Sequence, residues 1–135
     1  MQTKSLEEII SRLQSLAIDE EFDLIVAIAR GGLIPAALVQ QRLGIDLETL
    51  WLNIRDEQNN KLYDQPILIK PITFDATDKR ILLVDDRNKT GTTLAFAQGL
   101  LKKAKVVKTL VVNGEADYSL YNESCFKMPW RIDSQ

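Results

Sequence analysis

The sequence predicts an α/β fold in which a parallel β-sheet is covered by helices on both faces. Three continuous apolar runs, typical of strands buried on both sides, lie at residues 23–29, 80–84 and 106–112. Helical patterns separate these runs, and such alternation favours right-handed crossovers and parallel strands. Ligands of such sheets bind at the carboxyl ends of the strands. We therefore expect the functional residues to follow the apolar runs.

The first half of the chain contains two predicted helices. Residues 5–17 form an amphipathic pattern, and Ser5 with Glu8 gives the capping box that begins such a helix. A second helix follows the first buried strand, with Pro35 near its first turn and Gly44 just beyond its end. These two helices are expected to pack on the sheet.

The remaining elements are shorter or less regular. Residues 47–54 have strand character, and residues 55–65 are polar without periodicity, which predicts an exposed, mobile loop. Residues 66–70 form a short peripheral strand between prolines. A helix is expected over 93–104, and the tail from residue 124 onward adds a last extended segment.

The composition is that of one ordinary globular domain. The 135 residues are 45 % hydrophobic and 27 % charged, and a chain of this length buries roughly two-thirds of its unfolded surface. We therefore expect a single domain over residues 1–135. The net charge of −2 disfavours nucleic-acid binding, which needs a basic face. No apolar run approaches the roughly 20 residues of a transmembrane helix, so we expect no membrane partner.

Two scarce residue types narrow the chemistry. The lone Cys125 has no second cysteine to pair with, which favours a cytoplasmic protein. The chain has no histidine, which excludes Ser-His-Asp catalysis and imidazole-based zinc sites. Any proton transfer then depends on carboxylates, lysine, tyrosine, water or the substrate itself.

The most informative segment is ILLVDDRNKTGTTL at residues 81–94. Its aliphatic residues form a buried strand that delivers Asp85 and Asp86 to the edge of the sheet. The helix that follows exposes N–H groups suited to an anion, and Gly91 lets the backbone approach it closely. A phosphate here, with carboxylates for vicinal hydroxyls or Mg²⁺, fits a sugar phosphate. The alternative is that the two acids are only turn and capping residues.

This segment resembles the signature of type I phosphoribosyltransferases: four hydrophobic residues, two acids, and a Thr-Gly-x-Thr turn. The matching positions are Ile81 to Val84, Asp85, Asp86, Thr90, Gly91 and Thr93. The stretch IVAIARGGLIPAALVQQRLGI resembles the pyrophosphate loop and following helix of the xanthine-guanine branch, and KMPW resembles its C-terminal segment. The resemblance covers nearly the whole chain in order.

The resemblance implies a Rossmann-like parallel sheet flanked by helices, with a small hood. The hood consists of the flexible loop 55–65 and the C-terminal segment 118–135. A cis peptide bond is also implied between Ala29 and Arg30.

The resemblance further implies a site for phosphoribosyl pyrophosphate (PRPP) and Mg²⁺. Asp85 and Asp86 are expected to hold the ribose hydroxyls and the metal, and together with Lys89 they are the expected catalytic residues. The 5′-phosphate is expected on Lys89, Thr90, Gly91, Thr92 and Thr93. The leaving pyrophosphate is expected on Arg30, Gly31 and Gly32.

The base side of the site departs from the family pattern. Lys89 stands where purine enzymes usually have an aspartate; its side chain either reaches the base or only neutralises the phosphate. The substrate-contacting lysine of the family falls on Asn113, and the Ser-Tyr of its hood falls on residues 54–55. The stacking aromatic falls on Cys125, beside Phe126. Asn113 and Phe126 are the expected base contacts.

Four other aromatic residues have less specific roles. Trp51 and Trp130 are expected in the core rather than at a ligand. Tyr118 and Tyr121 belong either to the core or to the base pocket.

The resemblance implies a transferase that moves the 5-phosphoribosyl group from PRPP to a purine-like nucleobase and releases pyrophosphate. We expect a homodimer or homotetramer that acts in purine salvage. The alternative is a non-catalytic PRPP-binding regulator of nucleotide metabolism. A receiver-like phosphoacceptor also pairs acids at a strand end, but different loops follow its acids.

Overall fold

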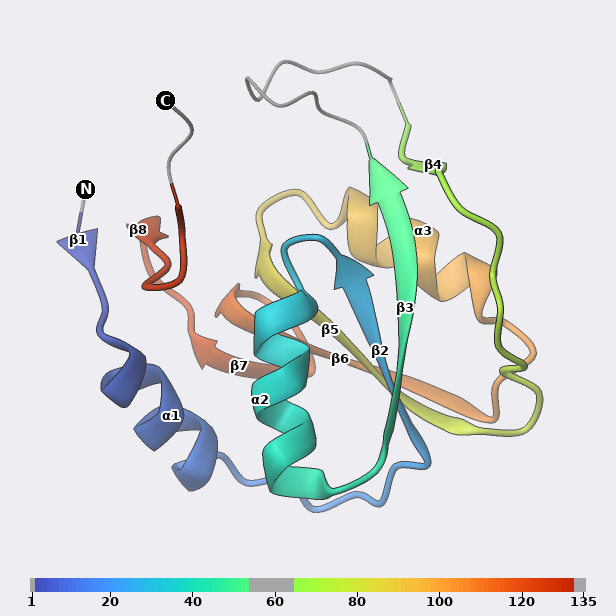
Figure 1. Ribbon diagram of the computed structural model, residues 1–135, viewed down its shortest axis with the longest axis horizontal. Coiled ribbons are helices and arrows are strands. Elements are labelled where there is room, and N and C mark those ends of the chain that lie inside the picture. Colours follow the sequence, from blue (N-terminus) through green and yellow to red (C-terminus); the bar gives the residue numbers. More distant parts are fainter. Residues whose placement is uncertain (1, 54–64, 133–135) are drawn as a thin grey trace.

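A central six-stranded sheet organises the computed structural model, which describes residues 2–53 and 65–132. All neighbouring strands are parallel except the pair at one edge, β4 with β3 (Figure 1). In spatial order the strands are β4 (Ile67–Leu68), β3 (Asp46–Asn53), β2 (Leu24–Ala29), β5 (Arg80–Asn88), β6 (Val106–Gly114) and β7 (Tyr118–Tyr121). The expected α/β class with a parallel sheet is confirmed.

The described part of the chain contains three helices, which cover the two faces of this sheet (Figure 1). The helices α1 (Leu6–Ser15) and α2 (Leu33–Leu43) lie on one face, where Ile9 and Val39 join a core with alternate residues of the strands. The helix α3 (Thr92–Leu100) lies on the other face and contributes Leu94 to a second core. All six residues of β2 are buried, as its continuous apolar run predicts.

The helix boundaries follow the predicted capping residues. Ser5 accepts from the Glu8 amide and the Glu8 side chain accepts from the Ser5 amide, both at 3.1 Å, so the capping box is present. Gly44 ends α2 in the left-handed conformation, at φ 64°, where glycine pays no Cβ penalty.

Two elements differ in length from the prediction. The strand β5 continues past Val84 to Asn88, because its ladder with β6 extends through the pair Arg87 and Asn113. The helix α3 ends at Leu100 instead of residue 104. The backbone after α3 instead binds the segment before β5: the Asp78 amide donates to the Lys103 carbonyl at 3.0 Å.

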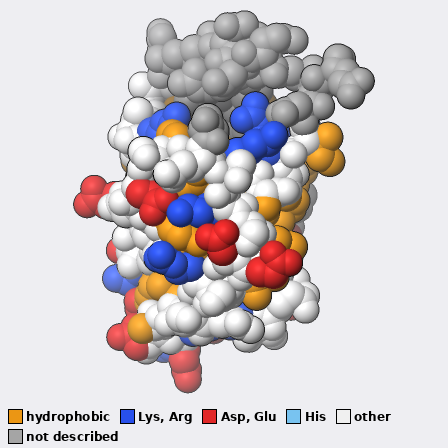
Figure 2. All heavy atoms as spheres, turned by 90° about the vertical axis from the view of Figure 1, so that its left-hand side faces the viewer, with side chains coloured by type: hydrophobic (Ala, Val, Ile, Leu, Met, Phe, Trp, Pro, Cys, Tyr) orange, Lys and Arg blue, Asp and Glu red, His pale blue; other side chains and the backbone are white. Residues whose placement is uncertain are grey.

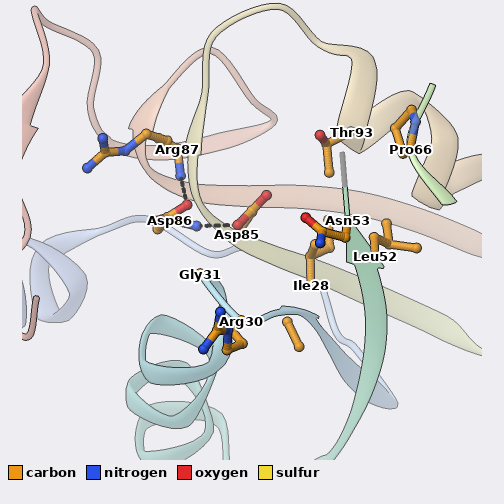
Figure 3. Close-up of a pocket in the computed structure, with 11 residues that line it drawn as sticks. Ile28, Arg30, Gly31, Leu52, Asn53, Pro66, Asp85, Asp86, Arg87 and Thr93 are labelled. Carbon is orange, nitrogen blue, oxygen red and sulfur yellow. Dashed lines mark hydrogen bonds between the residues drawn. The ribbon is translucent and has the colours of Figure 1, made fainter. Parts of the chain in front are cut away.

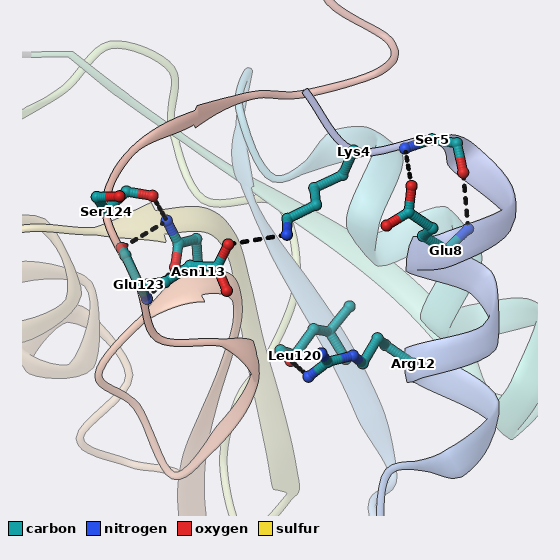
Figure 4. Close-up of polar contacts among 8 residues, drawn as sticks. All are labelled: Lys4, Ser5, Glu8, Arg12, Asn113, Leu120, Glu123 and Ser124. Atoms are coloured by element: carbon teal, nitrogen blue, oxygen red, sulfur yellow. Dashed lines mark hydrogen bonds and ion pairs between the residues drawn. The ribbon is translucent and has the colours of Figure 1, made fainter. Parts of the chain in front are cut away.

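Two short strands close the ends of the chain onto each other. The predicted last extended segment is β8 (Phe126–Lys127), and it pairs in parallel with β1 (Gln2–Thr3), which the sequence pattern did not indicate. Next to β1, the Lys4 ammonium forms an ion pair of 2.8 Å with Glu123 (Figure 4). The N-terminal segment therefore holds the C-terminal segment in place.

The four aromatic residues separate into core and partly buried positions. Tyr118 and Tyr121 are buried in the core beneath α1 and α2. Trp130 is partly buried against the same core. Trp51 is half-buried in β3, and the Lys70 ammonium lies 4.0 Å from the centre of its ring.

The surface on the side of α1 carries cationic and anionic side chains close together, around small hydrophobic areas (Figure 2). No described helix is both long and apolar enough to span a bilayer. The predicted mobile loop over 55–65 lies, apart from Gln65, outside the described residues.

Candidate active site

Two adjacent carboxylates lie near the carboxyl end of β5, where the sequence predicts them. Asp85 is only 8 % exposed, and its Oδ1 accepts from the Asp86 amide at 2.8 Å. The Asp86 Oδ1 in turn accepts from the Arg87 amide at 2.8 Å (Figure 3). These backbone bonds fix the two carboxylates at neighbouring positions on the edge of the sheet.

The buried carboxylate is in an unfavourable electrostatic position. Burial, followed by the negative charge of Asp86, raises the pKa of Asp85 well above its usual range. Both causes penalise the ionised form, and a bound cation would relieve both. Carboxylates perturbed in this way are common at ligand sites.

The turn after β2 packs directly against these acids. Gly32 is buried so tightly that a Cβ atom there would lie 2.4 Å from the Val84 carbonyl oxygen, so only glycine fits. A Cβ atom on Gly31 would lie 2.8 Å from Oδ1 of Asp86. The peptide bond between Ala29 and Arg30 is cis, which confirms the expectation. The two strand-end motifs thus meet at one edge of the sheet.

The loop before α3 contains a left-handed glycine and a small network of side-chain hydrogen bonds. Gly91 adopts φ 83°, which glycine tolerates best, and directly after it the Thr92 amide donates to the Thr90 hydroxyl at 3.3 Å. The Gly91 amide donates to Asn88 Oδ1 at 2.8 Å, and the Thr90 hydroxyl donates to that of Thr92 at 3.1 Å. The side chain of Lys89 is exposed.

One cavity of about 270 Å³ joins these parts (Figure 3). Arg30 and Gly31 line it from the turn after β2, and Asp85 and Asp86 line it from β5. The first turn of α3 contributes Thr93. The cavity therefore joins both expected ribose carboxylates with part of the expected pyrophosphate set, and it includes Thr93 alone of the expected phosphate residues. The other expected residues, Gly32, Lys89, Thr90, Gly91 and Thr92, do not line it.

The expected base contacts lie elsewhere in this conformation. Phe126 is fully buried, so its ring offers no face on which a base can stack. The side chain of Asn113 makes two hydrogen bonds to the backbone of Glu123. Its Nδ2 donates to the Glu123 carbonyl at 3.1 Å, and its Oδ1 accepts from the Glu123 N–H at 3.0 Å. Asn113 therefore holds the turn before β8, and the cavity wall does not include it.

Arg87 lines the cavity but was not selected from the sequence. Its position directly after the two acids could have indicated that it lies at the same site. A continuation of the strand by one more residue past Asp86 brings it to the same edge of the sheet.

The residues present fit a magnesium ion that arrives with a phosphate ligand. Two carboxylates supply the hard oxygen donors that Mg²⁺ prefers, and the negative charge of Asp86, the second cause of the raised pKa of Asp85 after burial, would attract a cation. Within residues 2–53 and 65–132, no cluster of three or more His, Cys, Asp or Glu side chains forms a complete metal cage. Water and a phosphate ligand would complete the coordination.

Fold and site together define an α/β protein with a polar ligand cavity at the carboxyl ends of its parallel strands. The chain belongs to the phosphoribosyl transferase domain family, whose model matches residues 2–129.

Individual relatives agree with this assignment. Xanthine-guanine phosphoribosyltransferase from Idiomarina loihiensis is 33 % identical over 88 residues, which cover 65 % of this chain and 54 % of the relative. The enzyme of the same name from Desulfotalea psychrophila is 34 % identical over 84 residues, covering 62 % of this chain and 50 % of that one. The match therefore spans about half the length of these relatives.

The fold is that of phosphoribosyltransferase structures. The crystal structure of a purine phosphoribosyltransferase from Pyrococcus horikoshii superposes with a TM-score of 0.81 at 27 % identity, covering 98 % of this chain and 95 % of that one. A hypoxanthine-guanine phosphoribosyltransferase from Bacillus anthracis superposes with a TM-score of 0.71 at 19 % identity, covering 93 % and 83 %. At that identity the second likeness concerns the fold alone.

Proposed function

We propose that this chain transfers the 5-phosphoribosyl group from PRPP to a purine base and releases pyrophosphate. The observation that carries the proposal is the single cavity in which the Arg30–Gly31 turn contacts the Asp85–Asp86 pair beside the start of α3. The names of the relatives from Idiomarina and Desulfotalea, and of the Pyrococcus structure, support a purine acceptor.

In this proposal the cavity and the loop that adjoins it before α3 each bind one part of PRPP. The 5′-phosphate lies on the backbone and hydroxyls of Lys89 to Thr93, at the N-terminus of α3. Asp85 and Asp86 accept hydrogen bonds from the ribose hydroxyls and hold Mg²⁺. Arg30, with the amides of Gly31 and Gly32, binds the pyrophosphate.

The reaction forms a bond between a base nitrogen and C1′ of the ribose as the bond from C1′ to the pyrophosphate oxygen breaks. Positive charge develops on the sugar, and the nearby carboxylates of Asp85 and Asp86 stabilise it. Magnesium, when bound, neutralises charge on the leaving pyrophosphate. Positioning supplies much of the rate, because the ends of PRPP are held on separate elements.

The proposal extends to the surroundings of the site. Residues 1–135 act as one phosphoribosyltransferase domain, and residues 55–65 and 118–135 form the hood. The protein is a cytoplasmic homo-oligomer, a dimer or tetramer. The exposed, unpaired Cys125 supports a reducing compartment.

A pyrophosphate-release assay tests this function. Purified protein is incubated with PRPP and Mg²⁺ together with hypoxanthine, guanine, xanthine, adenine or uracil, each in a separate reaction. We expect release with one or more of the purines and none with PRPP alone. If PRPP binds tightly in calorimetry but no base causes release, the protein is the PRPP-binding regulator that the sequence left as the alternative.

A further inference from the structure

Arg87 is a half-buried cation on the cavity wall, and the proposed PRPP contacts leave it without a role. Its Nη2 donates to the Phe126 carbonyl oxygen at 3.2 Å. Neither of the two ion pairs formed among the described residues includes it. A guanidinium carries several N–H donors in one plane, so a single carbonyl leaves much of its donor capacity for a ligand.

The Arg87 guanidinium extends away from Asp85 and Thr93 (Figure 3) and donates to the carbonyl of Phe126. In Figure 3, Arg30 lies on one side of Asp86 and Arg87 lies on the other. In a displacement at C1′ the nucleophile approaches from the side opposite the leaving group. If the pyrophosphate lies on Arg30, the acceptor base enters on the side of Arg87.

The backbone around Arg87 is held in place by its neighbours. Arg87 pairs in register with Asn113 of β6. The Asn113 side chain in turn donates from Nδ2 to the backbone carbonyls of Glu123 and Ser124. The carbonyl of Phe126, directly after this turn, receives the hydrogen bond from Arg87. The guanidinium therefore lies between the carboxylates and the C-terminal segment.

We propose that Arg87 determines specificity by donating paired hydrogen bonds to the O6 carbonyl oxygen and the N7 ring nitrogen of a 6-oxopurine. This inference rests on the proposed function. The arginine fork matches O6 and N7 of such a base, as it does in the recognition of guanine in DNA. A 6-aminopurine presents a donor in place of that oxygen, so it loses one of the two bonds.

The test compares two product nucleotides that differ at position 6 of the base. Calorimetry measures the binding of inosine monophosphate and adenosine monophosphate, each with Mg²⁺ and without pyrophosphate, so that the reverse reaction cannot occur. The proteins are the wild type, Arg87→Met, which keeps the apolar stem, and Arg87→Lys, which keeps the charge without the planar fork. Arg12→Met is the matched control: Arg12 also donates to a carbonyl, that of Leu120 at 3.1 Å, but lies outside the cavity (Figure 4).

We expect the wild type to prefer inosine monophosphate. Arg87→Met should lower the affinity for inosine monophosphate at least tenfold and change the affinity for adenosine monophosphate by less than threefold. Arg87→Lys should lie between the two, and Arg12→Met should match the wild type. The inference is overturned if the wild type shows no preference, if it binds neither nucleotide, or if Arg87→Met changes both affinities by the same factor.

The binding measurement separates this inference from the proposed function. If the wild type binds inosine monophosphate selectively through Arg87 but releases no pyrophosphate with any base, the specificity residue stands and the transferase activity fails. If pyrophosphate is released but Arg87→Met keeps the nucleotide preference, the activity stands and the role of Arg87 fails.

Discussion

Gly31 and Asp86 are in contact across two strand ends, so closely that a Cβ atom on residue 31 would lie 2.8 Å from the Asp86 Oδ1. One residue belongs to the turn after β2 and the other to β5, and both line the cavity. The position of the carboxylate therefore depends on the absence of a side chain at residue 31.

Gly31→Ala should impair PRPP binding with little effect on folding. The added methyl group meets the end of the Asp86 side chain, which is able to move away, rather than backbone. We expect PRPP affinity in the presence of Mg²⁺ to fall by about tenfold, since small displacements of binding groups have effects of this size. Calorimetry measures the affinity, and a melting curve measures the fold. An unchanged affinity would show that this contact does not position the carboxylate.

Gly32→Ala should have the opposite profile and destabilise the fold. Its Cβ atom would meet two backbone carbonyl oxygens, at 2.4 Å on Val84 and 2.8 Å on Ile28, neither of which can move independently of the sheet. Overpacking of this kind costs about 1–3 kcal/mol. Chemical denaturation measures the loss.

The matched control for Gly32 is Gly99→Ala in α3, where the added group meets nothing within 4 Å beyond its chain neighbours and its own helix backbone. That change should stabilise the helix by about 0.5–1 kcal/mol, because alanine is the better helix former. Equal effects of the two substitutions would contradict the close packing of the turn against β5.

Asp86→Asn should weaken PRPP binding and make it largely independent of Mg²⁺. Asparagine keeps the size of the side chain and an oxygen acceptor, but it removes the negative charge that the ion requires. Because Asp86 is only partly buried at the strand end, the melting temperature should stay close to that of the wild type. Calorimetry with and without Mg²⁺ decides the point, and full retention of the Mg²⁺ effect would mean that the metal is held elsewhere.

Lys89→Ala should reduce PRPP affinity several-fold without altering the choice of base. The Lys89 side chain is exposed beside the start of α3, and the cavity wall among the described residues does not include it. We therefore expect it to neutralise phosphate rather than to read the base. The measurement is kcat/KM for each purine, with Lys89→Asp as a second variant. If the ratio of kcat/KM between two purines changes by more than about twofold (~0.4 kcal/mol) in either variant, Lys89 contributes to the recognition of the base.

The fold was predictable because its elements are determined locally. The buried run of β2, the capping box of Ser5 and the C-cap at Gly44 each depend on residues adjacent in the chain. Parallel topology then brings successive strand ends to one edge, which is why the Arg30 turn and the aspartates were expected together. The end of α3 was missed because contacts with a distant segment, at Asp78, determine it.

The base side of the site was less predictable, because side-chain direction decides it. The side chain of Asn113 binds the backbone of the turn at Glu123, and the ring of Phe126 packs in the core. Arg87 reaches the cavity because β5 continues past its apolar run. The hydrophobicity pattern of β5 ends at its last apolar residue, so it does not predict the hydrogen bonds to β6 that extend the strand.

The most direct test of the central claim is ³¹P nuclear magnetic resonance of PRPP mixed with the protein, Mg²⁺ and hypoxanthine or guanine. We predict that the PRPP signals are replaced by equal amounts of pyrophosphate and a nucleoside monophosphate, and only when base, Mg²⁺ and intact Asp86 are all present. Persistence of the PRPP signals with every purine at catalytic protein concentrations would contradict phosphoribosyl transfer by this cavity.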